Sequence, residues 1–272
     1  MSMEIECQGD MDLDNGLDEH GYVLNRCSPQ NIQREFQPLI VETINLLVST
    51  FSNQIHSIYL YGSIARGEAV LYKSDLDISV IFHSPLVYAQ QLQLEQLASI
   101  ICRDFPIISK VDFDLGHVDE VMDSVEEYHW QFWLKHCCCC VWGNDLSVFF
   151  RKHRPSIQVS RAINSDLDCM LKATQAQLNT DNVAVKGKFI AKKLIRTSYS
   201  LVAEIDNSWH QSLERCARTV LTYEEVQSDG INQALAILDN DNSSVAEVTA
   251  LIDGYGRWLV NRFANEFASK KS

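Results

Sequence analysis

Two carboxylates separated by one residue stand in a short apolar run of the sequence. Asp75 and Asp77 occupy positions i and i+2 of an expected strand that runs from Asp75 to Phe82. Side chains two residues apart on a strand point to the same face. Carboxylates held side by side repel each other, so the pair favours a cation beside it. A hard divalent cation such as Mg²⁺ prefers oxygen ligands and also binds phosphate oxygens.

A glycine-serine turn lies just upstream of this pair. Gly62 and Ser63 follow an expected strand over residues 57–61, and eleven residues separate Ser63 from Asp75. Glycine allows a close approach of the backbone to a ligand. The backbone N–H groups of such a turn, together with the Ser63 hydroxyl, can donate hydrogen bonds to phosphate. The two motifs together indicate a site for a metal-bound phosphate compound.

A third acid is expected from a later strand, between Ile107 and Val118. Strand alternation sets Asp112 and Asp114 on one face, with Phe113 on the other. Either carboxylate could complete a two-metal site or a site that pairs a metal with a general base. The residues themselves leave both assignments open.

The first half of the chain is expected to mix strands with helices. Ser28 followed by Pro29 is typical of a helix start, because proline is tolerated at the first helical position. The expected helices run from Pro29 to about Phe51, from Ser84-Pro85 to about Cys102, and over residues 120–135, while residues 137–142 are ambiguous.

The second half is expected to contain only helices. Their approximate spans are 160–179, 184–206, 209–218, 223–238 and 243–269, with Ser160 and Ser243 as candidate N-caps. We therefore predict an acidic N-terminal segment over residues 1–24, a mixed α/β domain over residues 25–150, and a helical bundle over residues 158–270.

Composition narrows the possible partners. The chain has 272 residues, 46% of them hydrophobic, and a net charge of −13. This balance argues against a nucleic-acid partner and favours a small cationic acceptor. No apolar stretch approaches 18 residues and no basic leader is present, so neither a membrane span nor secretion is expected and the cytoplasm is predicted. The oligomeric state is not indicated.

Cysteine usage favours reduced thiols. The nine cysteines include the run Cys137, Cys138, Cys139 and Cys140, and neither the odd count nor the run suits a disulfide framework. The C-x-x-C within the run lacks a second ligand pair, so a buried apolar segment is expected rather than a zinc site. The nearby aromatics Trp130, Phe132 and Trp133 are expected in the core, with stacking on a base or sugar as the alternative.

The segments "YGSIARG" (residues 61–67) and "SDLDISV" (residues 74–80) resemble the nucleotidyltransferase superfamily, which includes DNA polymerase β, the minimal nucleotidyltransferases and the aminoglycoside adenylyltransferases. The resemblance implies an α+β fold, with a nucleotidyltransferase-type mixed β-sheet flanked by helices and then an all-α helical bundle. It implies Mg²⁺, two ions in all, and ATP or another nucleoside triphosphate. The residues that it assigns to metal are Asp75, Asp77 and Asp112, with Asp114 as the alternative third acid, and those that it assigns to nucleotide are Gly62, Ser63, Arg66 and Ser74.

The helical half resembles that of the aminoglycoside adenylyltransferases, which implies that residues 25–150 form the catalytic domain and that the bundle of residues 158–270 binds the acceptor and the nucleotide. The segment "KKLIRTSYSLV" (residues 192–202) is similar to their helix that faces the nucleotide, which implies that Lys192 and Arg196 reach the triphosphate. A solvated helix face explains this i, i+4 pair equally well. The sequence departs from those enzymes over residues 207–210, "NSWH", near which they often carry a lysine. The departure concerns the acceptor rather than the fold.

The resemblance implies transfer of a nucleoside monophosphate, AMP from ATP, to a hydroxyl of a small acceptor such as an aminoglycoside, with release of pyrophosphate and a role in antibiotic resistance. Adenylylation of a partner protein is the first alternative. A catalytically silent nucleotide-binding module is the second. A template-independent RNA polymerase is disfavoured by the acidic charge.

Overall fold

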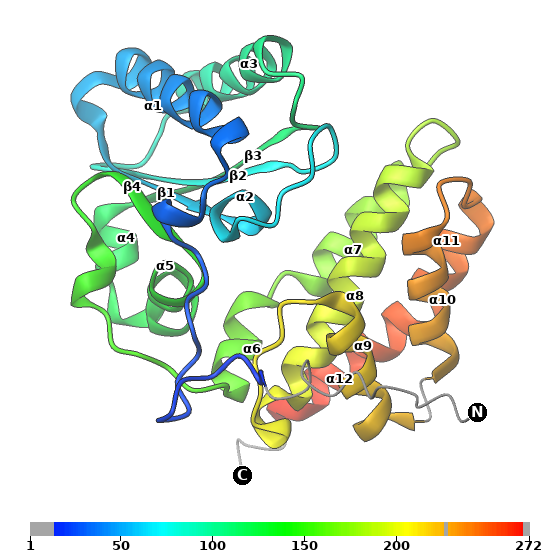
Figure 1. The fold of residues 1–272 in the computed structure, drawn as a ribbon. Coiled ribbons are helices and arrows are strands. Elements are labelled where there is room, and N and C mark those ends of the chain that lie inside the picture. The colour runs from blue at the N-terminus through cyan, green and yellow to red at the C-terminus, as the bar shows by residue number, and fades with distance from the viewer. Residues whose placement is uncertain (1–13, 226–227, 269–272) are drawn as a thin grey trace, which may run out of the picture. The chain divides into compact units, whose positions relative to one another are not determined.

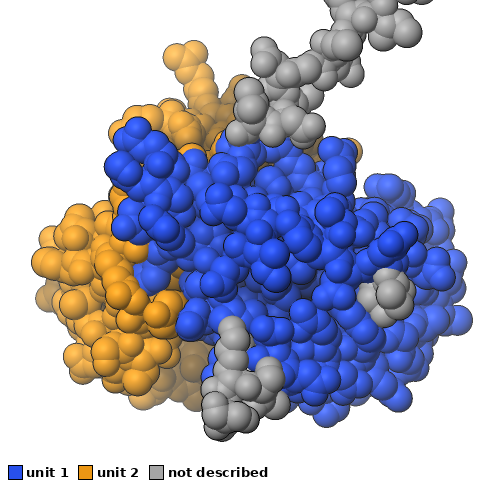
Figure 2. Space-filling model, turned by 90° about the horizontal axis from the view of Figure 1, so that it is seen from below, with its two compact units in different colours: residues 1–23, 153–272 blue, residues 24–152 orange. Residues whose placement is uncertain are grey.

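The computed structural model describes residues 14–225 and 228–268 (Figure 1). The acidic residues predicted to form the start of the N-terminal segment, up to residue 13, lie outside this range. The chain divides into two compact units, residues 24–152 and residues 1–23 with 153–272, coloured separately in Figure 2.

The unit of residues 24–152 is built on a four-stranded sheet in the order β3-β2-β1-β4. Strand β2 pairs with β1 in antiparallel and with β3 in parallel orientation, and β4 pairs with β1 in antiparallel orientation. The sheet is therefore mixed, as predicted. The strands are β1 (Ile55–Tyr61), β2 (Leu76–Phe82), β3 (Val111–His117) and β4 (Cys139–Gly143).

Helices cover both faces of this sheet. In Figure 1, α1 and α3 lie over one face and α4 and α5 over the other. The bounds are α1 (Gln37–Phe51), α2 (Gly62–Arg66), α3 (Tyr88–Asp104), α4 (Val118–Met122) and α5 (Phe132–His136). Ile78 and Val80 of β2 belong to one apolar cluster, whereas Ile81 belongs to another on the opposite face. Strand β2 is thus buried on both faces, where the sequence predicted alternation, because helices pack against each side.

Several predicted helix starts were wrong. Ser28 caps only the short 3₁₀ turn Pro29–Asn31, a second 3₁₀ turn follows at Arg34–Phe36, and α1 begins at Gln37. Pro38 accounts for this start, since proline is tolerated in the first turn of a helix but disrupts its interior. Helix α3 likewise begins at Tyr88, three residues after Pro85.

The expected helix over residues 120–135 is interrupted. Helix α4 ends at Met122, because Asp123 adopts extended backbone angles and caps the following 3₁₀ turn Ser124–Glu126. A π-helical segment, Glu127–Gln131, then leads into α5. The side chain of Gln131 donates to the Val121 and Asp123 carbonyls at 3.1 and 2.9 Å, which ties the pieces together.

The second unit contains the helical bundle. Helix α8 is its centre, and Ile190, Leu194 and Ile195 on it are fully buried. Among the described residues the helices are α6 (Ile157–Ile163), α7 (Leu167–Gln177), α8 (Val183–Asp206), α9 (Leu213–Tyr223), α10 (Ser228–Asp239), α11 (Val245–Leu251), a π-helical segment (Ile252–Gly256) and α12 (Arg257–Ala268). The predicted fold class, an α+β catalytic half and an all-helical half, is confirmed.

The two predicted N-caps of this unit were wrong. Ser156 caps α6, and Ser160 is buried inside it with its hydroxyl 2.7 Å from that of Ser200. Ser244 caps α11 in a capping box with Glu247, one residue beyond the predicted Ser243. A serine by itself is a weak signal for an N-cap. In α11 the cap is identified by the glutamate three residues further on, which completes the capping box.

Residues 14–23 belong to the helical unit. The Trp209 N–H donates to the Asn15 carbonyl at 2.7 Å, and the Val23 N–H donates to the His153 carbonyl at 2.9 Å. Leu17 and Val23 pair in an isolated β-bridge and are both buried. The sequence prediction treated these residues as part of a separate acidic segment.

Among the described residues, no helix has the length and apolar character that a membrane crossing requires.

Candidate active site

The register of two parallel strands brings the predicted acids together. Asp77 on β2 lies opposite Asp112 on β3, and Asp75 directly precedes β2. Carboxylate oxygens of Asp75, Asp77 and Asp112 lie within 4.8 Å of one another. Three side chains from two adjacent strands thus present oxygen ligands around one point.

Asp114, the other candidate for the third acid, stands outside this group of three. It lies opposite Ser79, two residues further along β3. Burial raises the pKa of its carboxyl group, and a hydrogen bond with the Tyr61 side chain partly offsets this rise. The Tyr61 ring meets the Trp133 ring edge to face, with 5.0 Å between centroids. Asp114 therefore takes part in an aromatic and hydrogen-bonded cluster beside the three acids.

The negative charge of the three acids is only partly compensated within the protein. Burial raises the pKa of Asp77 from its ordinary value to about 7, and the carboxylates of Asp75 and Asp112 add to the rise. A rise with these causes means that ionised Asp77 lacks sufficient positive charge nearby. A divalent cation with oxygen ligands would supply that charge, so the donor set fits Mg²⁺.

Lys110 contacts this site and was missed by the sequence analysis. Its ammonium Nζ lies 3.5 Å from Asp75 Oδ2 and also contacts Asp112 Oδ2. Burial lowers the pKa of Lys110, but the hydrogen bond with Asp112 and the charges of Asp75 and Asp112 outweigh this effect and raise it. Its spacing of two residues from Asp112 on one strand face was the signal available.

The backbone of Gly62 lies against the Asp77 carboxylate. Its φ of +73° lies in the left-handed region, and a Cβ built there would be 1.9 Å from Asp77 Oδ2. Only glycine fits without displacing that carboxylate. Tyr61 pairs with Asp77 across β1 and β2, and α2 begins at Gly62 directly after β1. The predicted turn of Gly62 and Ser63 therefore lies next to Asp77.

Two other predicted nucleotide contacts have partners within the protein. Arg66 donates from Nε to Glu68 Oε2 at 2.8 Å. The Ser74 hydroxyl accepts a hydrogen bond from the Val70 N–H at 2.9 Å, and its carbonyl accepts one from the Ser109 N–H at 3.0 Å. Ser74 thereby orders the loop that leads into β2.

Lys192 and Arg196 lie one turn apart on α8, and both are exposed. Arg196 donates from a terminal guanidinium nitrogen to the Gln211 carbonyl at 3.3 Å, which links α8 to the loop that follows it. They belong to the helical unit, whereas the three acids belong to the other unit.

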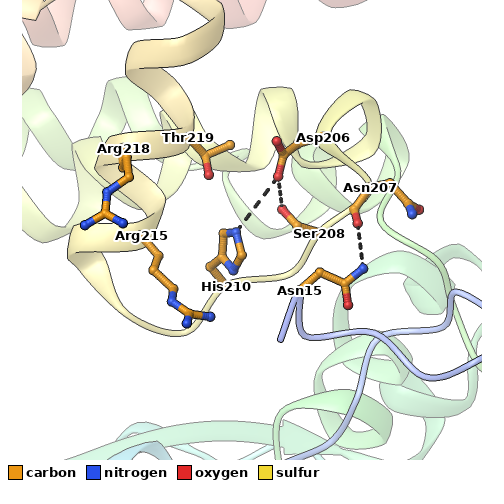
Figure 3. Close-up of a pocket in the computed structure, with 8 residues that line it drawn as sticks. All are labelled: Asn15, Asp206, Asn207, Ser208, His210, Arg215, Arg218 and Thr219. Carbon is orange, nitrogen blue, oxygen red and sulfur yellow. Dashed lines mark hydrogen bonds and ion pairs between the residues drawn. The ribbon is translucent and has the colours of Figure 1, made fainter. Parts of the chain in front are cut away.

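A polar cavity of about 350 Å³ lies in the helical unit (Figure 3). Figure 3 shows Asp206 joined to both Ser208 and His210, the latter with 3.9 Å between Nε2 and Oδ2. The sequence analysis assigned none of its residues to a site, because they come from the N-terminal segment, the end of α8, the loop after it, and α9. The lining is Asn15, Asp206, Asn207, Ser208, His210, Arg215, Arg218 and Thr219.

The four-cysteine run leads into edge strand β4, which begins at Cys139, so that Cys139 and Cys140 lie in the strand. Cys138 and Cys139 are buried, and burial raises the pKa of the Cys139 thiol to about 12. The eight cysteines in the described range are free thiols. Trp130 and Phe132, just before the run, are buried in the core, as expected.

Comparison with known families places these residues in a domain of known type. The family model for polymerase beta, nucleotidyltransferase, matches residues 42–121, which contain the turn at Gly62 and the three acids. These residues form a nucleotidyltransferase domain. The enzyme is therefore a nucleotidyltransferase, the class that the sequence resemblance predicted.

The fold of the enzyme is also found among solved structures. The chain is similar to the crystal structure of spectinomycin adenyltransferase AAD(9) from Enterococcus faecialis, which was solved with ATP and spectinomycin. The identity is 15%, the TM-score is 0.52, and the match covers 84% of this chain and 98% of that chain. None of the curated proteins matches the sequence. At this identity the likeness shows a shared fold.

Proposed function

We propose that the enzyme transfers AMP from ATP to a hydroxyl group of a small cationic acceptor, such as an aminoglycoside or aminocyclitol antibiotic, and releases pyrophosphate. The observation that carries the proposal is the grouping of the Asp75, Asp77 and Asp112 carboxylates beside the Gly62 turn in a nucleotidyltransferase domain. That grouping supplies oxygen ligands for Mg²⁺ next to a turn suited to phosphate.

The proposed roles follow from the chemistry of each side chain. Asp75, Asp77 and Asp112 would hold two Mg²⁺ ions, which when bound neutralise the charge on the triphosphate and favour ionisation of the acceptor hydroxyl. Ser63 and the backbone of the Gly62 turn would donate hydrogen bonds to the departing phosphates. Asp112 would accept the proton of the attacking hydroxyl. Asp114, hydrogen-bonded to Tyr61, would position the surrounding groups instead.

The identity of the substrates has separate support. The structural neighbour was solved with ATP and spectinomycin, which makes an adenine nucleotide and a drug of that type the first candidates. The net charge of −13 suits a cationic acceptor. We keep Lys192 and Arg196 as proposed contacts of the triphosphate, and the cytoplasm, where the free thiols would remain reduced, as the proposed compartment.

A pyrophosphate-release assay with ATP, Mg²⁺ and a panel of aminoglycosides and aminocyclitols tests the proposal. We expect release that depends on the acceptor and is lost in Asp77→Asn. Labelled ATP that marks a protein in a lysate, while no drug is modified, would instead support a protein acceptor. ATP binding without any release would indicate a silent module.

Two neighbouring acids provide a matched pair of variants. We expect Asp112→Asn to lower kcat/KM by about 10²–10⁴-fold, the range for removal of a general base, because it removes both the base and a metal ligand. Asp114→Asn should lower kcat/KM by less than about tenfold, since the amide oxygen of asparagine can still accept the hydrogen bond from Tyr61 and only the charge is lost. Equal losses in the two variants would contradict the separate roles. Circular dichroism and thermal melts check that both variants fold.

A further inference from the structure

Lys110 is the residue at the three acids that the proposed reaction does not use. It immediately precedes β3, and its ammonium contacts Asp112 and lies 3.5 Å from Asp75 Oδ2. The Asp75 side chain also accepts a hydrogen bond from the Ser109 hydroxyl. One cation of the protein itself therefore interacts with two of the three carboxylates.

The oxygens that Lys110 contacts are those of the proposed metal ligands. The carboxylate oxygens of Asp75, Asp77 and Asp112 gather within 4.8 Å, so an ammonium bonded to two of these groups competes with a divalent cation for the same charge. Within the part of the chain that the structure describes, Lys110 is the only Lys or Arg that forms an ion pair with any of these three acids. Without it, three neighbouring carboxylates would repel each other unscreened.

The Lys110 side chain is exposed enough to rotate away from the two carboxylates. Half of its side-chain surface is exposed, compared with 29% for Asp75 and 43% for Asp112. A lysine ammonium is a compact charge on a flexible four-carbon stem, and water solvates it well. Rotation of that stem would release both carboxylates without any change of the backbone.

We propose that Lys110 is a built-in counter-cation of the metal-free enzyme, which balances Asp75 and Asp112 and must leave them when divalent cations bind. The inference rests on the metal site of the proposed function. Lys110 weakens the binding of a metal ion alone, so metal enters the site most favourably together with a nucleotide whose phosphates supply further oxygen ligands. The metal-free protein in turn avoids the cost of three unpaired carboxylates.

The test measures the binding of Mn²⁺, in the absence of nucleotide, to the full chain and to Lys110→Met. Isothermal titration calorimetry gives the affinity of each protein. Methionine matches the length of the lysine stem and lacks the charged ammonium. We expect Lys110→Met to bind Mn²⁺ about tenfold more tightly, the size expected for one nearby charge close to a protein surface. In EDTA, the melting temperature of Lys110→Met should lie below that of the wild type. Added Mn²⁺ should raise the melting temperature of Lys110→Met by more than it raises that of the wild type.

Three further variants make the measurement specific. Lys110→Arg keeps the positive charge and should bind Mn²⁺ with nearly wild-type affinity. Lys110→Gln provides a second neutral variant should Lys110→Met fold poorly. Lys172→Met is the matched control, because Lys172 pairs with a single carboxylate, Asp168, on α7 in the helical unit, and its loss should leave Mn²⁺ affinity unchanged.

The outcomes separate this inference from the proposed reaction. Equal or weaker Mn²⁺ binding by Lys110→Met, in a protein that still releases pyrophosphate, would overturn the role of Lys110 alone. Tighter Mn²⁺ binding without pyrophosphate release would support the role of Lys110 while the proposed reaction failed. No Mn²⁺ binding by any variant would overturn the inference together with the metal site.

Discussion

The carboxylate of Asp77 lies against the backbone of Gly62 and leaves no room for a side chain at that position. Two constraints coincide here, since Gly62 has a φ of +73° and its hypothetical Cβ would lie 1.9 Å from Asp77 Oδ2. The glycine of the motif therefore does more than let phosphate approach. It determines where a proposed metal ligand lies.

We expect Gly62→Ala to lower kcat/KM by more than about tenfold, because alanine must displace the Asp77 carboxylate. The left-handed backbone adds a cost of about 1–2 kcal/mol to the folded state. Pyrophosphate release and the midpoint of urea unfolding are the measurements. Gly254→Ala is the control, since a Cβ at Gly254 meets nothing within 4 Å and should leave activity unchanged. A fully active Gly62→Ala enzyme would contradict this account of the turn.

At the scale of elements, the loop after α8 depends on Tyr199. The hydroxyl of Tyr199 accepts a hydrogen bond from the His210 N–H at 2.7 Å and lies 2.8 Å from the Ser208 hydroxyl. The rings of Tyr199 and His210 stack with 5.5 Å between centroids. Burial lowers the pKa of His210, which the charge of Asp206 only partly offsets. Burial in this loop therefore favours the neutral imidazole.

Acid should destabilise this loop through His210. Because the pKa of the folded state lies below the unfolded value near 6.5, the stabilisation is present above that value and is lost as pH falls through the folded pKa. We expect the melting temperature of His210→Gln to decrease less than that of the wild type when the pH is lowered from about 7.5 to about 5. His20→Gln, which alters an exposed histidine, is the control. Identical acid profiles for wild type and His210→Gln would refute the prediction.

At the scale of the whole molecule, the helical unit is built from both ends of the chain. Asn15 bonds to the backbone of Trp209, and a Cβ added at Gly16 would lie 2.0 Å from the Trp209 carbonyl oxygen. The same loop lines the cavity of Figure 3, to which Asn15 also contributes. The segment of residues 14–23 thus completes both the loop and the cavity.

We expect Gly16→Ala to detach this segment from the loop. Hydrogen exchange at the Trp209 amide should then accelerate, because its acceptor, the Asn15 carbonyl, moves away. Gly21→Ala is the matched control: Gly21 has a similar φ of +79°, but its Cβ would meet only Arg154 at 3.7 Å. Equal exchange rates at Trp209 in the two variants would show that the close approach of Gly16 has no structural role.

Local patterns in the sequence were enough to predict most residues of the proposed site. The spacing of Asp75 and Asp77, and the Gly62-Ser63 turn before them, are relations over a few residues that the geometry of a strand and a turn largely determines. They sufficed to predict the nucleotidyltransferase domain, the mixed sheet and the helical half that follows. The helix boundaries were predicted less well than the motifs. Pro38 and Asp123 determine whether an α-helix or a tighter turn forms only in combination with their neighbours.

The tertiary structure decided what depends on contacts between distant residues. The parallel register of β2 and β3 sets Asp112, rather than Asp114, opposite Asp77 and brings Lys110 to Asp75. Pairing with β1 places Cys139 and Cys140, the end of the cysteine run, in an edge strand. Residues 14–23 join a helical unit whose other residues begin at 153. Strand register and packing arise from side chains far apart in the sequence, so no local spacing of residues encodes them.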